Sequence, residues 1–404
     1  MPSALSSIIR DHRIRVPTLT LVALAFTYAS TMPYQSMIGI SELGLSDGAY
    51  SGLIFVAALV NVTTSLTLGI WSDRLNDRRP LVLALSVCGM LGFGMIYEFR
   101  TAAVFIFATL VLIPISNSTY SILLASIRAT TNTMERGRGA AITATVRALF
   151  SGSWALAPGL IGLYLLNSQS MTPAYGIAGL ASLACFCLYL FLARPAPKRE
   201  GAPTQHVGFL PSLGRIISPS VLSRIGVMAL LIGMQRSNSV VSPLIITHAA
   251  GGSVVDVGFM AGLVAFLEMP FMMMWGALQR RFRSAHLLAL GTLIYCAYLA
   301  LLGFASVPWH IYALVPINAC GTAAILSIPI TYMQDLIADR PGLGSSLISV
   351  NTFVANGLSA AIFATGTSFT SYSGTAQFAA AIGLVSIGLL LFLERNPRAA
   401  RLPA

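Results

Sequence analysis

The sequence has 404 residues, of which 56% are hydrophobic and only 9% are charged. Soluble domains carry about a quarter charged residues, so the composition excludes a soluble globular domain and indicates a chain surrounded mostly by lipid. The formal net charge of +11 raises nucleic-acid binding as an alternative. The basic residues are scattered over short polar segments without interleaved aromatic residues, which argues against that alternative.

Apolar runs long enough to cross a bilayer as helices recur along the whole chain. The alternating polarity of membrane-spanning strands is absent from the sequence. The predicted fold is therefore an all-α integral membrane protein with twelve transmembrane helices. The predicted spans are 16–38, 49–71, 80–98, 102–126, 139–165, 173–193, 219–246, 257–278, 285–305, 311–333, 345–367 and 375–393.

The longest polar segment, 194–218, lies between the sixth and seventh spans and is rich in Pro and Gly. Such a composition is typical of a linker. It predicts an N-terminal six-helix bundle over 1–193, a cytoplasmic linker over 194–218 and a C-terminal six-helix bundle over 219–404.

The basic residues predict the orientation of the chain. If the N-terminus is cytoplasmic, all of the 24 basic residues except Arg100, Arg147 and Arg236 fall on the cytoplasmic side. Cytoplasmic loops carry an excess of Lys and Arg. We therefore expect both termini in the cytoplasm, and a multi-pass protein of a bacterial inner membrane.

The two halves repeat at an offset of about 205 residues. Gly69-x-x-x-Asp73-Arg74 precedes the third span, and Gly276-x-x-x-Arg280-Arg281 precedes the ninth. Six helices repeated in parallel orientation are the plan of major facilitator transporters, in which the solute site lies at the membrane midplane between the halves.

The segment GIWSDRLNDRR resembles the loop 2–3 motif of the major facilitator superfamily. Gly69 permits the close approach of a second helix. Asp73 lies near a helix end, where its carboxylate can accept hydrogen bonds from the N-terminus of a neighbouring helix. Arg74, Arg78 and Arg79 surround this acid with cations. The resemblance implies a conformational latch between the halves; the alternative is an ordinary basic cytoplasmic loop.

The fifth span contains TVRALFSGSWALAPGLIGLYL, which resembles the antiporter motif of efflux facilitators. Ser153, Ala157, Pro158 and Gly162 match its small or helix-kinking residues. The alternative is a Pro-kinked packing helix with no role in coupling.

Three charged residues lie deep within predicted spans: Arg147, Arg236 and Glu268. A charge facing lipid at such depth costs about 2.5–3.5 kcal/mol or more, so we expect these groups to face a cavity or one another. We predict that Glu268 accepts solute hydroxyls or a proton, and that Arg147 positions the solute or alters the proton affinity of Glu268. A purely structural Arg147–Glu268 ion pair is the alternative.

Amide and aromatic side chains at matching depth are further candidates for solute binding. Amides carry both donors and acceptors, which suits sugar hydroxyls, and aromatic rings stack on sugar faces. The alternative for each is a hydrogen bond between helices. The candidates are Tyr34, Gln35, Asn61, Asn117, Gln235, Asn238, Asn318, Asn351 and Asn356, with Trp154 and Phe353.

Beyond these motifs, the chain resembles the sugar efflux transporter family over nearly its whole length. The matching segments are SDRLNDRR, VRALFSGSWALAPG, SNSVVSPLIITH, GLVAFLEMPFMMMWGALQRRF and ITYMQDLIADRPGLGSSLISVNT. The resemblance implies export of small sugars or glycosides in exchange for protons, with Arg147, Glu268, Asn238 and Asn351 lining the site.

One position departs from this family pattern. Arg236 stands where the family has a small residue, so the predicted cavity has a net positive charge when Glu268 is ionised. An exporter of an anionic solute such as a sugar acid is therefore an alternative.

Other functions remain as alternatives. A multidrug efflux pump would have a wide aromatic cavity, although the two embedded arginines disfavour cationic drugs, and a membrane sensor would need an additional cytoplasmic domain. The sequence contains no nucleotide-binding loop, metal-ligand cluster or Ser/His/Asp set, so we expect no enzyme activity, metal or cofactor. We expect a monomer whose partners are a sugar-like solute, protons and the lipid bilayer.

Overall fold

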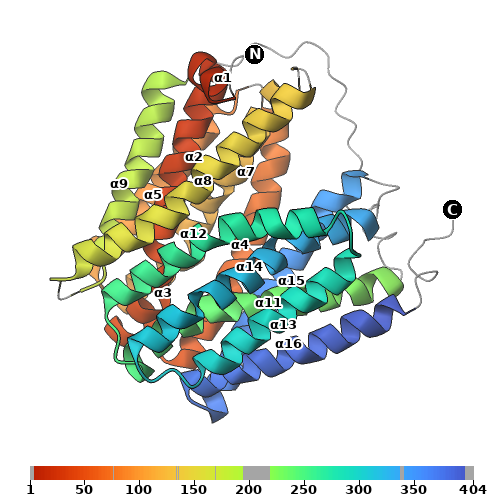
Figure 1. Ribbon diagram of the computed structural model, residues 1–404. Coiled ribbons are helices and arrows are strands. Elements are labelled where there is room, and N and C mark those ends of the chain that lie inside the picture. Colours follow the sequence, from red (N-terminus) through yellow and green to blue (C-terminus); the bar gives the residue numbers. More distant parts are fainter. Residues whose placement is uncertain are drawn as a thin grey trace. The chain divides into compact units, whose positions relative to one another are not determined.

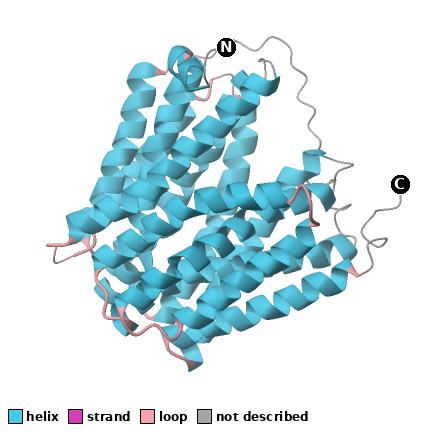
Figure 2. Ribbon diagram, viewed as in Figure 1, coloured by secondary structure: helices cyan, strands magenta, loops and turns pink. Residues whose placement is uncertain are grey.

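The computed structural model describes residues 4–75, 77–132, 134, 136–168, 170–193, 219–336 and 341–395. These residues form helices joined by short loops, without any strand in the described part of the chain (Figure 2). The predicted linker, 194–218, lies outside the described residues, and so do the side chains of Asp73 and Arg74.

The chain divides into two compact units. Unit 1 contains the described residues of Met1–Ser46, Val56–Ala202 and Val257–Gly262, and unit 2 contains those of Asp47–Phe55, Pro203–Asp256 and Leu263–Ala404. Two helices therefore contribute to both units, namely α4 (Asp47–Arg74) and α12 (Val254–Leu278). The predicted boundaries of the two bundles stay a prediction.

Unit 1 is built around a core in which α2 packs on α7, α8 and α9, and α5 packs on α7 and α9. Buried aliphatic residues such as Leu24, Leu85 and Ile122 fill the space between these helices. Its elements are α1 (Ala4–Arg10), α2 (His12–Thr31), η1 (Met32–Tyr34), α3 (Gln35–Met37), η2 (Ile38–Glu42), α5 (Arg79–Phe99), α6 (Ala102–Phe107), η3 (Ala108–Leu112), α7 (Ile113–Thr131), α8 (Arg136–Leu165), α9 (Pro173–Cys187) and η4 (Leu188–Leu192) (Figure 1).

In unit 2, α13 packs on α14 and α16, and α11 packs on α15 and α16. Leu231, Trp275 and Leu288 belong to its buried apolar core. Its remaining elements are α11 (Pro219–Leu244), η5 (Ile245–Ala249), α13 (Ser284–Leu302), α14 (Pro308–Leu336), α15 (Pro341–Phe369) and α16 (Tyr372–Glu394).

The helices begin where the sequence supplies caps for their free N–H groups. The Thr101 and Ser371 side chains accept hydrogen bonds from the first turns of α6 and α16. Ser253 and Asp256 form a capping box at the start of α12. Arg100 ends α5 in a left-handed conformation, with φ of 50°.

The internal repeat that the sequence predicts is visible in the order of the helices. The helices α5 and α13 begin at residues 79 and 284, and α8 and α15 begin at residues 136 and 341. The π-helical turns η2 and η5, which follow the first and seventh spans, begin at residues 38 and 245. The halves therefore share even a local irregularity of the backbone.

Each predicted span coincides with a helical segment, and ten of these segments in the described residues are long and apolar enough to cross a membrane. The segment α11–η5 is outside these ten, because α11 carries Arg224, Arg236 and two amides. Its polarity indicates a surface turned away from lipid. The first ten side chains of α15 lie outside the described residues.

Candidate functional site

The polar segment of α11 faces α15 within unit 2. A Cβ atom placed on Gly233 would lie 2.9 Å from the Ala355 carbonyl oxygen, so the glycine allows these two helices to approach closely. One turn further along α11, the Arg236 Nη1 donates a 2.7 Å hydrogen bond to the Asn356 Oδ1. The Arg236 side chain is partly buried and keeps its other donors.

A network of buried tyrosines supports the opposite side of the same segment. The Tyr298 hydroxyl donates to the Asn238 Oδ1 at 3.4 Å, and the Tyr295 hydroxyl donates to the Gln235 carbonyl oxygen at 3.4 Å. Both tyrosines are at most 1% exposed. Their rings pack at 5.4 Å between centroids. The network fixes the rotation of α11 about its axis.

Asn318 continues this polar region on α14. Its Oδ1 accepts a 2.9 Å hydrogen bond from Thr322, and the asparagine is 8% exposed. Tyr295 lies close enough to Asn238, Thr322 and Glu268 to interact with each of them. Unit 2 therefore gathers amides and hydroxyls from α11, α13 and α14 around Tyr295, and the carboxyl group of Glu268 on α12 interacts electrostatically with the same tyrosine.

Glu268 is partly buried on α12. Among the described residues it has no ion pair and no hydrogen bond. A carboxyl group in such a position is free to take up a proton or to accept hydroxyl hydrogens from a solute. Its predicted pairing with Arg147 stays a prediction.

A second arginine of α11 has a different environment. Arg224 is 2% exposed, and its Nε lies 3.2 Å from the Glu394 Oε1. Its Nη2 donates to the Leu393 carbonyl oxygen at 2.9 Å, and Tyr332 donates to the same carboxylate at 2.7 Å. These side chains connect the start of α11 to the ends of α14 and α16, and the negative charge of Glu394 balances the positive charge of Arg224.

Asn351 is fully buried, with 0% exposure. Its Nδ2 donates a 2.9 Å hydrogen bond to the Ile225 carbonyl oxygen, which joins α15 to α11. Its Oδ1 has no partner in the described part of the chain. In this conformation the side chain joins two helices and has no surface open to a solute.

The candidates of unit 1 occupy varied positions. Tyr34 is fully buried and donates to the Pro158 carbonyl oxygen at 2.9 Å, which links η1 to the kinked helix α8. Gln35 and Trp154 are partly buried, and Arg147 is exposed on α8.

Two more amides lie on the neighbouring helices of unit 1. The Asn117 Oδ1 on α7 is buried and has no hydrogen-bond partner in the described residues. Asn61 on α4 accepts from Ser65 at 3.3 Å, and Ser65 contacts Ser118 at 3.3 Å. Asn117 and Asn61 therefore use only part of their hydrogen-bonding capacity within the described residues.

The small residues of the predicted antiporter motif in α8 receive a segment of α12 within unit 1. A Cβ atom on Gly258 would lie 3.1 Å from the Gly162 Cα, and one on Gly262 would lie 2.7 Å from the Ala155 carbonyl oxygen. Close packing through small residues is the structural consequence expected for this motif.

The predicted latch is described only in part. Arg79 donates to the Tyr189 and Leu190 carbonyl oxygens at 3.3 and 2.5 Å, and so caps the end of η4. Arg78 donates to the Ser72 carbonyl oxygen at 3.3 Å. At Gly69 an added Cβ would meet no heavy atom of the described residues within 4 Å, and the predicted approach between the halves stays a prediction. The Asp73 and Arg74 side chains are outside the description.

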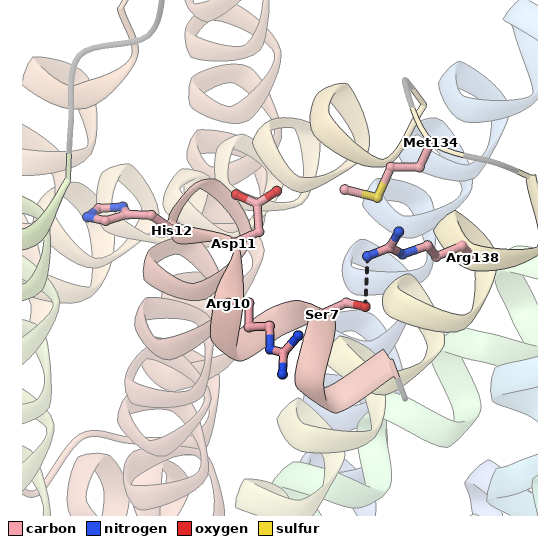
Figure 3. A pocket seen from close by; sticks show the side chains of 6 residues that line it. All are labelled: Ser7, Arg10, Asp11, His12, Met134 and Arg138. Carbon is pink, nitrogen blue, oxygen red and sulfur yellow. Dashed lines mark hydrogen bonds between the residues drawn. The ribbon is translucent and has the colours of Figure 1, made fainter. Parts of the chain in front are cut away.

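A cavity of about 370 Å³ lies at the ends of α1, α2 and α8, away from the embedded charges. Figure 3 shows Arg138 joined to Ser7, while the His12 ring points away from both. It is lined by Ser7, Arg10, Asp11, His12, Met134 and Arg138. Asp11 caps the N-terminus of α2 by accepting from the Arg13 N–H at 2.9 Å, so the acid of this cavity is part of the helix end.

A model of the Major Facilitator Superfamily matches residues 18–364 of the chain. The chain belongs to the Major Facilitator Superfamily. It is therefore an all-α, multi-pass membrane transporter with the major facilitator fold.

Two solved structures show the same fold. The nucleoside transporter NupG aligns with a TM-score of 0.76 at 12% identity, over 96% of this chain and 99% of that chain. The peptide transporter POT in complex with sulfate aligns with a TM-score of 0.73 at 17% identity, over 96% of this chain and 95% of that chain.

Relatives among characterised sequences confirm the resemblance to sugar efflux transporters. A Deinococcus radiodurans protein whose name describes a sugar efflux transporter is 26% identical over 95% of this chain and 98% of its own length. Sugar efflux transporter A of Dickeya chrysanthemi is 24% identical over 84% of this chain and 81% of its own length. Sugar efflux transporter C of Escherichia coli is 24% identical over 83% of this chain and 84% of its own length. These relatives are membrane transporters and not enzymes.

Sequence reasoning did not identify the tyrosine network. Tyr295 and Tyr298 lie three residues apart in an otherwise apolar span, which places them on one helix face. Buried tyrosine hydroxyls need hydrogen-bond partners. This spacing could have indicated a polar contact inside the bundle.

We predict that Asn351 and Asn356 respond differently to replacement by alanine. Because Asn351 joins two helices, Asn351→Ala is expected to lower the free energy of unfolding by about 0.5–1.5 kcal/mol, measured by denaturant titration in detergent micelles. The half-saturating solute concentration, measured per folded protein in liposomes, should stay the same.

Asn356→Ala, on the same helix, is the matched variant and should weaken solute affinity, because Asn356 orients the Arg236 guanidinium group. If Asn351→Ala weakens solute affinity at unchanged stability, the interhelical role of Asn351 is contradicted.

Proposed function

We propose that the protein exports a sugar-like small polar solute across a bacterial inner membrane by secondary active transport, in exchange for protons. Membership of the superfamily and the names of the bacterial relatives support transport of a sugar. The observation that carries the proposal is the set of embedded polar residues of unit 2: Gln235, Arg236 and Asn238 on α11, Asn318 on α14 and Glu268 on α12.

The chemistry of these groups suits a polyhydroxylated solute. Each sugar hydroxyl is a donor and an acceptor, and the amides offer both functions at fixed positions. Tyr295 and Tyr298 hold α11 in place, so its amides are oriented before the solute arrives. In unit 1, the unpartnered Asn117 Oδ1 is an acceptor that a solute hydroxyl would satisfy.

For the remaining unit 1 candidates, we propose contacts of Arg147, Trp154 and Gln35 with the solute. Tyr34 and Asn351 would support the site from behind, because both are fully buried and bonded to backbone carbonyl groups.

Glu268 is the proposed coupling group. A carboxyl group within a spanning helix avoids the cost of a buried charge by taking up a proton. Since no described residue neutralises Glu268, the solute and the proton would alternate as its partner.

The loop residues Asp73, Arg74, Arg78 and Arg79, with Gly69, are proposed to control the change of conformation. We propose that both termini lie in the cytoplasm, because nearly all basic residues then fall on that side. The boundaries 1–193, 194–218 and 219–404 are proposed for the two bundles and their linker, and the transporter is proposed to act as a monomer.

A direct test is counterflow in proteoliposomes with labelled mono- and disaccharides and sugar acids. We expect the labelled solute to accumulate transiently when the vesicles are preloaded with the same unlabelled solute. Protein that is shown to be folded, yet exchanges none of these solutes, would contradict the substrate class. Exchange of hydrophobic cationic drugs alone would instead favour a multidrug pump.

Proton coupling has a separate test. In Glu268→Gln the side chain cannot ionise, so solute exchange should persist while accumulation driven by a pH gradient is lost. Glu98→Gln makes the same chemical change at an exposed position near the end of α5, and it is the control that should leave both activities intact. If Glu268→Gln retains accumulation driven by the pH gradient, Glu268 is not the coupling group.

A further inference from the structure

Two arginines of α11 differ in how their charges are balanced. Arg224 has the carboxylate of Glu394 at 3.2 Å. Arg236 lies 12 residues further along the same helix, about 18 Å at 1.5 Å per residue. Its hydrogen-bond partner among the described residues is the neutral amide of Asn356, at 2.7 Å. An amide orients a guanidinium group but does not neutralise its charge.

The described acids of unit 2 do not supply the missing counter-charge. Asp47 accepts from Tyr372, and Asp256 accepts from Ser253 and Tyr312. Glu394 forms its ion pair with Arg224. Among the described residues, no ion pair joins Glu268 to Arg236. The guanidinium group of Arg236 is thus left without an anionic partner among the described residues of unit 2.

The side chain of Asp335 and the whole of Asp339 lie outside the described residues.

We infer that the solute itself carries the counter-charge, and that it is a sugar acid whose carboxylate binds Arg236. This inference rests on the proposed function and specifies its substrate class. A guanidinium group offers two parallel N–H donors that match the two oxygens of a carboxylate. The hydrogen bond to Asn356 uses one of its five donors and holds the plane of the guanidinium group fixed.

The single positive charge of Arg236 favours a carboxylate over a phosphate as the charged group of the solute. A phosphate monoester carries about −1.5 to −2 charges at neutral pH, whereas one guanidinium group balances a single charge. A monoanionic sugar satisfies Arg236 and leaves Gln235 and Asn238 for its hydroxyls.

The experiment compares glucose, glucuronate and glucose 6-phosphate in counterflow with proteoliposomes. Glucose and glucuronate share a ring and differ at one carbon, so their difference reports the carboxylate alone. We expect glucuronate to be exchanged at a half-saturating concentration at least about thirtyfold lower than glucose, the ratio expected for a buried charge pair. Arg236→Gln should remove this preference, and Arg236→Lys should retain part of it.

Ser239→Ala, at an exposed position of the same helix, is the control and should keep the wild-type preference. The preference is read as a ratio of two solutes, so a variant with less folded protein still gives an answer.

The possible outcomes separate this inference from the proposed function. Exchange of glucose without preference for glucuronate, or a preference that survives in Arg236→Gln, overturns the sugar acid and leaves sugar export intact. Preference for glucose 6-phosphate overturns the carboxylate. Absence of exchange for all sugars and sugar acids with folded protein overturns the proposed function itself.

Discussion

The free-energy cost of a polar group in hydrocarbon governs this structure. A spanning helix satisfies its own backbone, but each embedded charge or amide needs a partner inside the protein. The chain meets this requirement in two ways. Most embedded polar groups have protein partners, such as Tyr298 on Asn238 and Asn351 on the Ile225 carbonyl oxygen. A few, notably Arg236, Glu268 and the Asn117 Oδ1, keep hydrogen-bonding atoms without a partner among the described residues. These are the groups that we propose to bind the solute or the proton.

The free-energy cost of an unpaired polar group also explains why arginine side chains donate hydrogen bonds to carbonyl groups at helix ends. The last carbonyl groups of a helix have no partner within it. Arg79 caps η4, and Arg224 caps the end of α16 while it pairs with Glu394. Each arginine connects the last helix of its unit to another helix. Residues of a motif that the sequence associates with a latch thus also have a structural role.

The positions of the helices could be predicted from the sequence, because the length of an apolar run and the basic residues between runs report directly on the bilayer. The repeat could be predicted too, since related positions such as Asp73 and Arg280 recur at a fixed offset. The partners of the polar residues could not. Whether Asn351 faces a solute or a neighbouring backbone depends on the rotation of α15, which its polar residues do not determine because they are spread around the helix.

Helix packing sets a similar limit. Gly233 allows a close helix approach without belonging to a known motif, whereas the approach expected at Gly69 stays a prediction. A glycine in a span shows that an approach is possible and does not identify the neighbour. Tyr295 and Tyr298 escaped prediction because single tyrosines in an apolar run resemble ordinary bilayer-interface residues.

The most direct test of the central claim, that uncompensated polar groups of α11 bind the solute, is a structure determined with a saturating sugar acid. The account predicts the carboxylate within hydrogen-bonding distance of the Arg236 guanidinium group, with the Asn356 contact kept and sugar hydroxyls near Gln235 or Asn238. A solute bound away from α11, with Arg236 still held only by Asn356, would contradict it.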